Sequence, residues 1–224
     1  MITNRDQLID ALANNSSRIV IDKASIANTA PGQYHSLWRA TGQPGQGAIP
    51  TAAANCNQST TGGMQFSQQT APAKSYLAYL EAVNTVNATT VEVHDRLMHM
   101  GGLNGTLTTA QTVGLDFNGV TADNMAERIG DANYSDIQWW LEWYTDTGAT
   151  VVTATVAVTY NDGTTGNLTA VSLAATRRAS FMQSLNGLIP AGVAGKFIRA
   201  VNSVTLSATT GAAGNFGVTA TRLR

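Results

Sequence analysis

The strongest constraint on the fold is a run of β-branched and small side chains in the second half of the chain. From Thr150 to Tyr160 nearly every residue is Val, Thr or Ala, which are residue types that favour a pleated strand over a helix. Asn161-Asp162-Gly163 follows at once and is a hairpin-turn signal. Residues Gly166 to Leu173 then return as the partner strand. The segment therefore predicts an antiparallel hairpin.

Similar strand signals, separated by turn residues, recur from Lys74 onward. We expect strands at Tyr76–Val83, Thr89–Met100, Thr106–Val113, Ile137–Tyr144, Phe181–Leu185, Phe197–Thr209 and Phe216–Leu223, and one or two helical turns at Asp123–Ile129. In Phe197–Thr209 the alternation places Ile198, Ala200 and Val204 on one face and Val201 on the other. A mainly β, antiparallel β-sandwich or jelly-roll-like domain is the architecture that such a pattern favours.

The first third of the chain follows a different pattern. Asn4 to Ala13 predicts a short amphipathic helix, with Leu8, Ile9 and Leu12 on one face, and Ile19–Ile21 predicts a short buried strand. From Ala30 to Ala73 the sequence is rich in Gly, Pro, Gln and Asn without a period, so we expect an extended irregular arm or a linker. The predicted organisation is a helix and arm at 1–73 and a β-sandwich domain at 74–224.

Charge narrows the classes of partner. The formal net charge is -1 and only 12% of residues are charged, about half of ordinary usage. A nucleic-acid-binding protein needs a basic stripe, whereas Lys23, Lys74 and Lys196 lie far apart in the chain, so we expect no nucleic-acid partner. Low charge suits a surface that other protein chains cover. An ordinary monomer with exposed Thr-rich strand faces is the alternative.

Cysteine content and hydropathy carry little further information. Cys56 is the single cysteine, so no internal disulfide is expected. No stretch approaches the ~20 apolar residues of a membrane span, and the N-terminus lacks the apolar run of a signal peptide. We therefore expect no membrane partner and synthesis in a cytoplasm.

No motif for catalysis or cofactor binding is present, and we assign no catalytic, cofactor-binding or metal-binding residue. His94 and His99 are five positions apart. An odd offset puts two residues on opposite faces of a regular strand, which argues against a two-histidine metal site. Asp131, Asp136 and Asp146 near turns leave a loop calcium site open. An enzyme with scattered catalytic residues, for example at His94 and His99, is a third hypothesis that no motif supports.

Aromatic residues give the candidate interface. In Trp139–Tyr144, alternation separates Trp139 and Trp143 from Trp140 and Tyr144, so one face anchors a core and the other is free for a partner chain or a sugar, unless both are core. Large aromatics are unusual in a pure linker, so Tyr34 and Trp38 indicate an arm that either orders against a partner or packs back on its own domain. The interface candidates are Tyr34, Trp38, Trp140 and Tyr144.

Several segments resemble virion structural proteins of tailed bacteriophages. They are Asp95–His99 with Gly101–Thr112, Tyr134–Tyr144 and Ser203–Ala208, within a likeness that covers roughly Lys74 to Arg224. The resemblance best suits a head decoration or cement protein, and implies a non-enzymatic protein on the capsid surface of a virion, made in the host cytoplasm. It further implies the major capsid protein and copies of this chain as partners, in a homotrimer or another homo-oligomer. A tail or neck component, or a receptor-binding component that contacts glycan, is the alternative.

Overall fold

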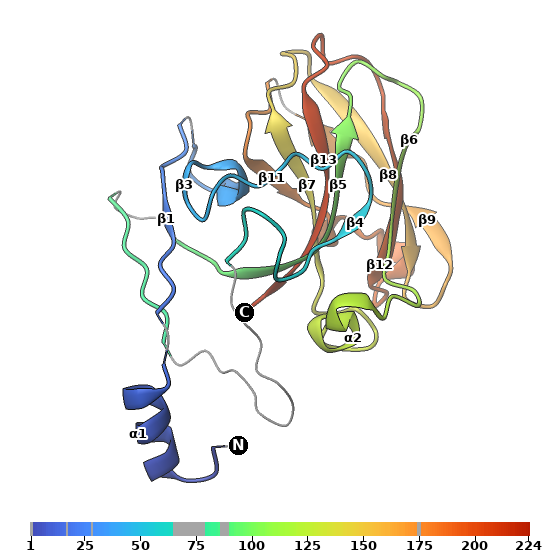
Figure 1. Cartoon of the computed structure of the whole chain (residues 1–224). Coiled ribbons are helices and arrows are strands. Elements are labelled where there is room, and N and C mark those ends of the chain that lie inside the picture. Colours follow the sequence, from blue (N-terminus) through green and yellow to red (C-terminus); the bar gives the residue numbers. More distant parts are fainter. Residues whose placement is uncertain (1, 17, 28, 65–78, 86–89, 174–175) are drawn as a thin grey trace.

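The computed structural model describes every residue except 1, 17, 28, 65–78, 86–89 and 174–175. The described chain is a mainly β protein in which antiparallel sheets pack together, with a short N-terminal helix and few other helices (Figure 1). The predicted fold class, a β-sandwich preceded by a helix and an irregular arm, is confirmed.

The larger sheet has six strands and draws on both ends of the chain. Its order is β2 (Tyr34–His35), β11 (Phe181–Ser184), β7 (Gln138–Thr145), β13 (Asn215–Leu223), β5 (His94–Leu103) and β4 (Ala54–Asn55). All neighbours pair antiparallel. Both edge strands, β2 and β4, are therefore short pieces of the predicted arm.

The second sheet has five strands. It runs β10 (Val171–Leu173), β8 (Val152–Tyr160), β12 (Ile198–Leu206) and β6 (Gln111–Asp116), and β9 (Thr165–Asn167) also pairs with β8. The predicted hairpin is present, because β8 and β9 are antiparallel partners on either side of the turn at 161–164. The predicted return strand is split into β9 and β10, both of which pair with β8.

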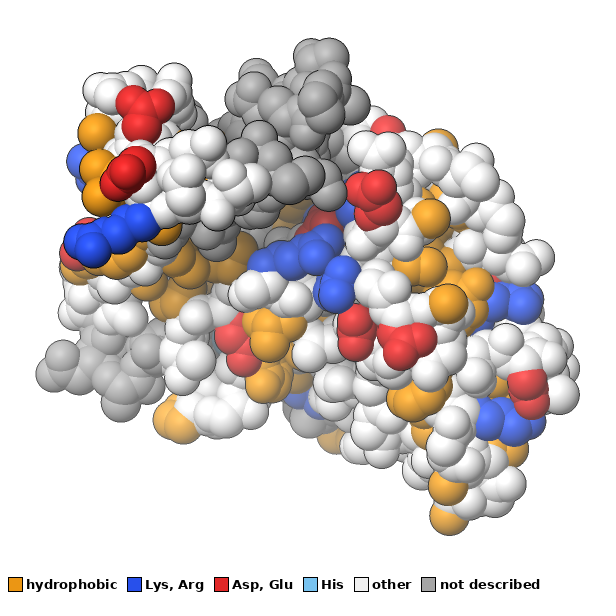
Figure 2. Space-filling view, turned by 90° about the horizontal axis from the view of Figure 1, so that it is seen from below, with side chains coloured by type: hydrophobic (Ala, Val, Ile, Leu, Met, Phe, Trp, Pro, Cys, Tyr) orange, Lys and Arg blue, Asp and Glu red, His pale blue; other side chains and the backbone are white. Residues whose placement is uncertain are grey.

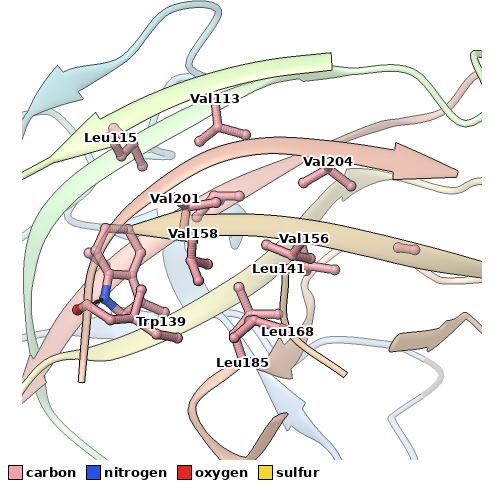
Figure 3. Packing of buried hydrophobic residues seen from close by; sticks show 14 of the residues in the cluster. Val113, Leu115, Trp139, Leu141, Val156, Val158, Leu168, Leu185, Val201 and Val204 are labelled. Carbon is pink, nitrogen blue, oxygen red and sulfur yellow. Dashed lines mark hydrogen bonds between the residues drawn. The ribbon is translucent and has the colours of Figure 1, made fainter. Parts of the chain in front are cut away.

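The hydrophobic core fills the space between the two sheets (Figure 3). Val156 and Val158 of β8 and Val201 and Val204 of β12 meet Leu141 of β7 and its neighbours across that space. Trp139 and Trp143 of β7 are the largest side chains that are fully buried in the described structure. The indole N–H of Trp139 donates to the carbonyl of Ile198 at 2.9 Å, so its burial leaves no unpaired donor.

The remaining elements are short. They are α1 (Arg5–Asn14), β1 (Asp22–Lys23), η1 (Leu37–Arg39), β3 (Gly42–Gln43), η2 (Ala122–Asn124), α2 (Met125–Arg128), η3 (Asn186–Leu188) and η4 (Ala191–Val193). Strands β1 and β3 form a separate two-stranded sheet. The helical turns expected at 123–129 are present as η2 and α2.

Four predicted strands differ from the structure, and one of them, predicted at Thr89–Met100, is present as β5, which begins at His94 and ends at Leu103. Ile19–Ile21 forms no strand, and its side chains are exposed. The strand that follows in the chain, β1, starts only at Asp22. The prediction for Tyr76–Val83 falls partly outside the described residues, and 79–83 has no strand. The strand predicted from Thr106 begins at Gln111, because the side chain of Asn104 accepts a hydrogen bond from the Thr106 amide and holds a turn there.

The predicted boundary at 73/74 lies among residues outside the described ones. Residues 34–56 supply edge strands to the sheet built from the later part of the chain, and they are referred to below as the belt.

Candidate interaction site

The belt crosses the outer face of the six-stranded sheet. It enters the sheet as β2, beside β11 at one edge, and leaves as β4, beside β5 at the opposite edge. Figure 1 shows this blue-to-cyan chain passing in front of the strands. As a result Trp140, Glu142 and Tyr144, which alternation places on the outer face of β7, are buried as deeply as the core residues of the same strand.

A buried ion pair lies at the centre of this covered face. Arg96 of β5 contacts the Glu142 carboxylate at 2.6 Å and 3.2 Å, which is a bidentate arrangement. The same guanidinium donates to the Tyr144 hydroxyl at 3.0 Å, the Thr219 hydroxyl at 3.0 Å and the His99 Nδ1 at 3.0 Å. The Thr219 hydroxyl in turn donates to Glu142.

Burial and charge act against each other in this network. Burial is the largest influence on Glu142 and disfavours its ionised form, but the Arg96 charge and the hydrogen bonds from Arg96, Thr219 and Ser36 together lower the pKa of that carboxyl. For Arg96 burial alone would lower the pKa, and Glu142, Tyr144 and Cys56 together raise it. Burial, with the neighbouring positive charge of Arg96, lowers the pKa of His99 to about 4. At neutral pH the site therefore holds one ion pair and a neutral imidazole.

Aromatic rings of the belt close over the pair. The guanidinium carbon of Arg96 lies 4.3 Å from the centroid of the Trp38 ring, a cation–π contact. The rings of Trp38 and His99 meet edge to face at 5.7 Å, and those of Tyr34 and Trp140 lie 5.1 Å apart. Trp38 is only 8% exposed as a result.

The structure brings together all four residues predicted from sequence as interface candidates. Trp38, Trp140 and Tyr144 are buried within their own chain, while Tyr34 is 51% exposed. The aromatic face of β7 that could have been free for a partner or a sugar is thus covered by the belt. In this arrangement Tyr34 is the one of the four that offers substantial surface to another molecule.

His94 and His99 do not lie on opposite faces as their spacing predicted. The pairing of β5 with β13 shifts register between Ala220 and Thr221, which leaves one extra residue on β5 between positions 96 and 98. His94 consequently lies 6.3 Å from the Trp140 ring, on the covered face that also holds His99. Within the described residues, no group of three His, Cys, Asp or Glu side chains could hold a metal ion.

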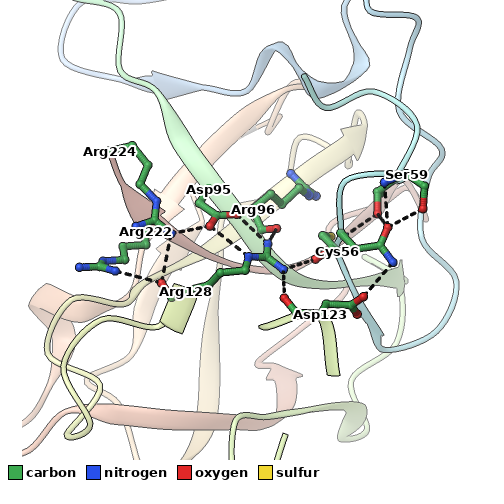
Figure 4. A network of polar contacts seen from close by, with 10 residues as sticks. Cys56, Ser59, Asp95, Arg96, Asp123, Arg128, Arg222 and Arg224 are labelled. Carbon is green, nitrogen blue, oxygen red and sulfur yellow. Dashed lines mark hydrogen bonds and ion pairs between the residues drawn. The ribbon is translucent and has the colours of Figure 1, made fainter. Parts of the chain in front are cut away.

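A second polar network fastens the end of the belt (Figure 4). Arg128 of α2 makes a bidentate contact with Asp95, at 2.6 Å and 3.1 Å, and donates to the carbonyl of Cys56 at 2.6 Å. Arg224 also contacts Asp95, at 2.6 Å. Residues from α2, β5 and the C-terminus therefore meet at the Asp95 carboxylate, and Arg128 links this group to the belt through Cys56.

The carboxylates considered for a calcium loop have other partners. Asp136 pairs with Arg222 at 3.0 Å and Asp146 with Arg178 at 2.7 Å. Asp131 accepts a hydrogen bond from the Asn133 amide. Asp131 and Asp136 belong to one turn, where the Asp131 amide donates to the Asp136 carboxylate at 3.3 Å, and Asp146 pairs elsewhere with Arg178.

The N-terminal segment, residues 2–16 and 18–21, is the part of the described chain that leaves the most apolar surface uncovered. Helix α1, predicted from Asn4 to Ala13, is capped by Asn4, whose side chain accepts from the Gln7 amide at 2.9 Å. No α1 residue is buried, and its apolar face is 44–51% exposed at Leu8, Ile9 and Leu12. Figure 1 shows α1 apart from the sandwich.

The segment's second apolar group, Ile19–Ile21, is exposed as well.

Figure 2 shows that charged side chains are sparse on the face it draws, in keeping with the low charge of the whole chain. An open depression of about 260 Å³ lies beside the belt, lined in part by Ile26, Arg39 and Ser180. Arg39 in this depression already donates to the carbonyl of Gly47.

Comparison of the chain with models of protein families, with curated proteins and with solved structures finds no match. In the described part of the chain, no helix combines the length and the apolar character needed to cross a membrane.

Proposed function

We propose that this chain is a structural protein of a tailed-bacteriophage virion, most like a head decoration protein that binds the capsid shell and stabilises it. Its partners are then the major capsid protein and further copies of the chain, and no catalytic step is part of its role. The observation that carries the proposal is the exposed apolar face of α1, a helix with no buried residue that stands apart from the packed core of the sandwich. The sequence resemblance supports the virion setting.

The physical argument concerns the cost of leaving this segment in water. An isolated helix of ten residues is marginal in water, since helices shorter than ~12–15 residues rarely persist alone. Full burial of an exposed Leu or Ile side chain gains about 1.5–3 kcal/mol. Leu8, Ile9 and Leu12 are 44–51% exposed, so covering what remains of each gains about half of that. A protein surface that accepts this helix therefore both orders it and gains binding energy, and the gain is multiplied when many copies bind one shell.

The alternative, a tail, neck or receptor-binding component, differs in the partner it needs. Glycan-binding platforms use exposed aromatic rings, and of the four candidate aromatics only Tyr34 is substantially exposed. A glycan array separates the two roles, because a decoration protein binds no sugar selectively.

The test uses capsids that lack this protein, mixed with the purified chain, with cosedimentation and resistance to heat as readouts. We expect the chain to bind and to raise the temperature at which the capsid releases its genome. A Leu8→Ser/Leu12→Ser variant should bind at least tenfold more weakly, whereas Ala13→Ser on the same exposed helix should bind as the parent does. Absence of binding by the parent chain, or equal binding by both variants, would refute the proposal.

A further inference from the structure

The belt packs on the outer face of the six-stranded sheet in the way that one protein chain docks on another. Its contacts with the sandwich are two-residue strand pairings at each edge, aromatic contacts between them, and a few hydrogen bonds, such as the one from Arg128 to the Cys56 carbonyl. Adding a strand to a sheet edge is also a common way for one chain to bind another. This raises the question of whether each surface is complete without the other.

The central part of the belt is held by its own hydrogen bonds. The indole N–H of Trp38 donates to the Ala48 carbonyl at 3.0 Å, and the Gly47 amide donates to the Trp38 carbonyl at 2.8 Å. The Gln46 side chain donates to the Arg39 carbonyl at 2.6 Å. These bonds join residues within the belt, so they can persist when the belt leaves the sheet.

Most polar partners of the covered ion pair belong to the sheet itself. His99, Glu142, Tyr144 and Thr219, to which Arg96 donates, lie on its strands, and the belt adds hydrogen bonds from Ser36 to Glu142 and between Arg96 and Cys56, which a second belt would supply equally. Uncovering them exposes a charged pair that water solvates well, unlike a dry apolar core. The face can therefore lose one belt and accept another.

The connecting chain is long enough for the belt to reach a neighbour. Asn57 still contacts Asp123 of the sandwich, and β5 starts only at His94. A stretch from 58 to 93 spans up to roughly 100 Å when extended, at about 3.3 Å per residue. That is several times the radius of a domain of this size.

We propose that the six-stranded sheet is a docking surface for the belt of a second copy of this chain. In the exchanged form, β2 and β4 of one copy pair with β11 and β5 of the other, and Trp38 covers the Arg96–Glu142 pair across the interface. The contacts are the same in both forms, so the choice between them depends on concentration. A dilute chain closes on itself, and crowded copies exchange belts. This inference concerns copies of the chain alone and does not depend on the virion role.

Single-cysteine variants distinguish the two forms. Tyr34 of the belt and Met182 of β11 are direct partners in the antiparallel register, where Cα atoms lie within the range a disulfide spans. Tyr34→Cys chains and Met182→Cys chains are mixed in denaturant, refolded together at increasing concentration and oxidised. A disulfide between positions 34 and 182 can then form only between two copies. Mass spectrometry of the linked peptides identifies it.

We expect the fraction of chains in the 34–182 linked dimer to rise about tenfold for each tenfold increase in total concentration while the dimer remains a minor species. The Tyr34→Cys/Met182→Cys double variant at low concentration should instead close within one chain, which verifies the geometry. The parent chain is the control for Cys56, since burial raises the pKa of its thiol to about 11 and keeps it unreactive. No 34–182 dimer at any concentration, with efficient closure of the double variant, would overturn the proposal.

A measurement without substitutions covers the case in which the variants misfold. Two isotopically distinct preparations of the parent chain are refolded together at millimolar concentration, and NMR contacts between copies are recorded. The exchanged form predicts a contact between the ring of Trp38 in one copy and the ring of His99 in the other, which lie 5.7 Å apart when paired. Contacts only within single copies would count against exchange.

Discussion

At the scale of single residues, the Arg96–Glu142 pair is the feature on which most of the covered face depends. Arg96 is 12% exposed in its side chain and Glu142 1%, so neither charge is well solvated. Removing one partner leaves the other as an uncompensated buried charge, which costs more than the pair itself contributes.

The first prediction is that Glu142→Gln destabilises the chain by about 3–5 kcal/mol, because Arg96 then stays charged without a carboxylate. Arg96→Met combined with Glu142→Leu should cost less than the sum of the two single changes, as urea unfolding of all variants will measure. Arg178→Gln is the matched control, since its pair with Asp146 is exposed and is worth under about 1 kcal/mol. Equal losses in the control and in Glu142→Gln would contradict this interpretation.

The second prediction follows from His99. Its pKa is about 4 in the folded chain, against an ordinary 6.5, because it is buried beside Arg96. In the unfolded chain the imidazole takes up a proton below about pH 6.5, whereas the folded chain resists until about pH 4, so stability falls as pH drops through this window. We expect a loss of about 1.5–2 kcal/mol between pH 7 and pH 5 from this residue.

His99→Gln tests that assignment, because glutamine keeps an acceptor for Arg96 and does not titrate. Its free energy of unfolding should vary less between pH 7 and pH 5 than that of the parent chain, by about 1.5–2 kcal/mol. An unchanged slope would show that other groups carry the pH dependence, among them His35, whose pKa burial also lowers.

At the scale of elements, strand types follow from composition, but their faces depend on bulges. Val201 and Val204 both lie in the core between the sheets although strict alternation places them on opposite faces of β12, because the pairing with β8 and β6 shifts register between Val201 and Ser203. The same kind of shift on β5 puts His94 and His99 on one face. A bulge is decided by the partner strand, so strict alternation along one segment cannot reveal it.

In the candidate site too, some features can be predicted from the sequence and others depend on which strands become neighbours. The Trp-rich strand and the belt aromatics are visible in the sequence as large apolar side chains in unexpected places. Arg96 and Glu142 carry no such signal, since they are distant in sequence and become partners only when β5 and β7 flank β13. The exposure of Ile19–Ile21 was missed for a related reason: β-branched residues favour a strand but do not specify that any other strand is there to cover them.

The third prediction concerns the fit of the belt. A Cβ at Gly47 would come within 2.0 Å of the Trp38 ring, so Gly47→Ala must displace that ring from Arg96. Overpacking of this kind costs about 1–3 kcal/mol. Gly45→Ala, two residues away with open space around its Cβ, should change the stability by less than about 0.5 kcal/mol. Tryptophan fluorescence and thermal unfolding of both variants are the measurements, and similar behaviour of the two would argue against a closely packed belt.

At the scale of the whole molecule, the chain consists of a packed sandwich, a belt that covers one of its outer faces, and an N-terminal segment that covers nothing. The core between the sheets is built from residues after position 93. Different parts of the chain therefore serve stability and partner binding. The sandwich and the belt stabilise the fold, and the exposed helix is available to bind a partner.

The final prediction separates these parts by truncation. Deleting residues 1–21 removes no buried side chain among the described residues, so the midpoint of thermal unfolding should change by less than about 2 °C.

Deleting 1–60 also removes the belt and exposes Trp140, Glu142 and Tyr144. Since 1 kcal/mol corresponds to roughly 2–4 °C for a chain of this size, the loss of the Trp38 and Tyr34 contacts should lower the midpoint by about 5 °C or more. Added peptide 30–60 should restore part of that loss, because the uncovered sheet retains its own ion pair and both free edges. A shorter chain that unfolds at the parent's temperature would show that the belt adds nothing to the stability of the sandwich.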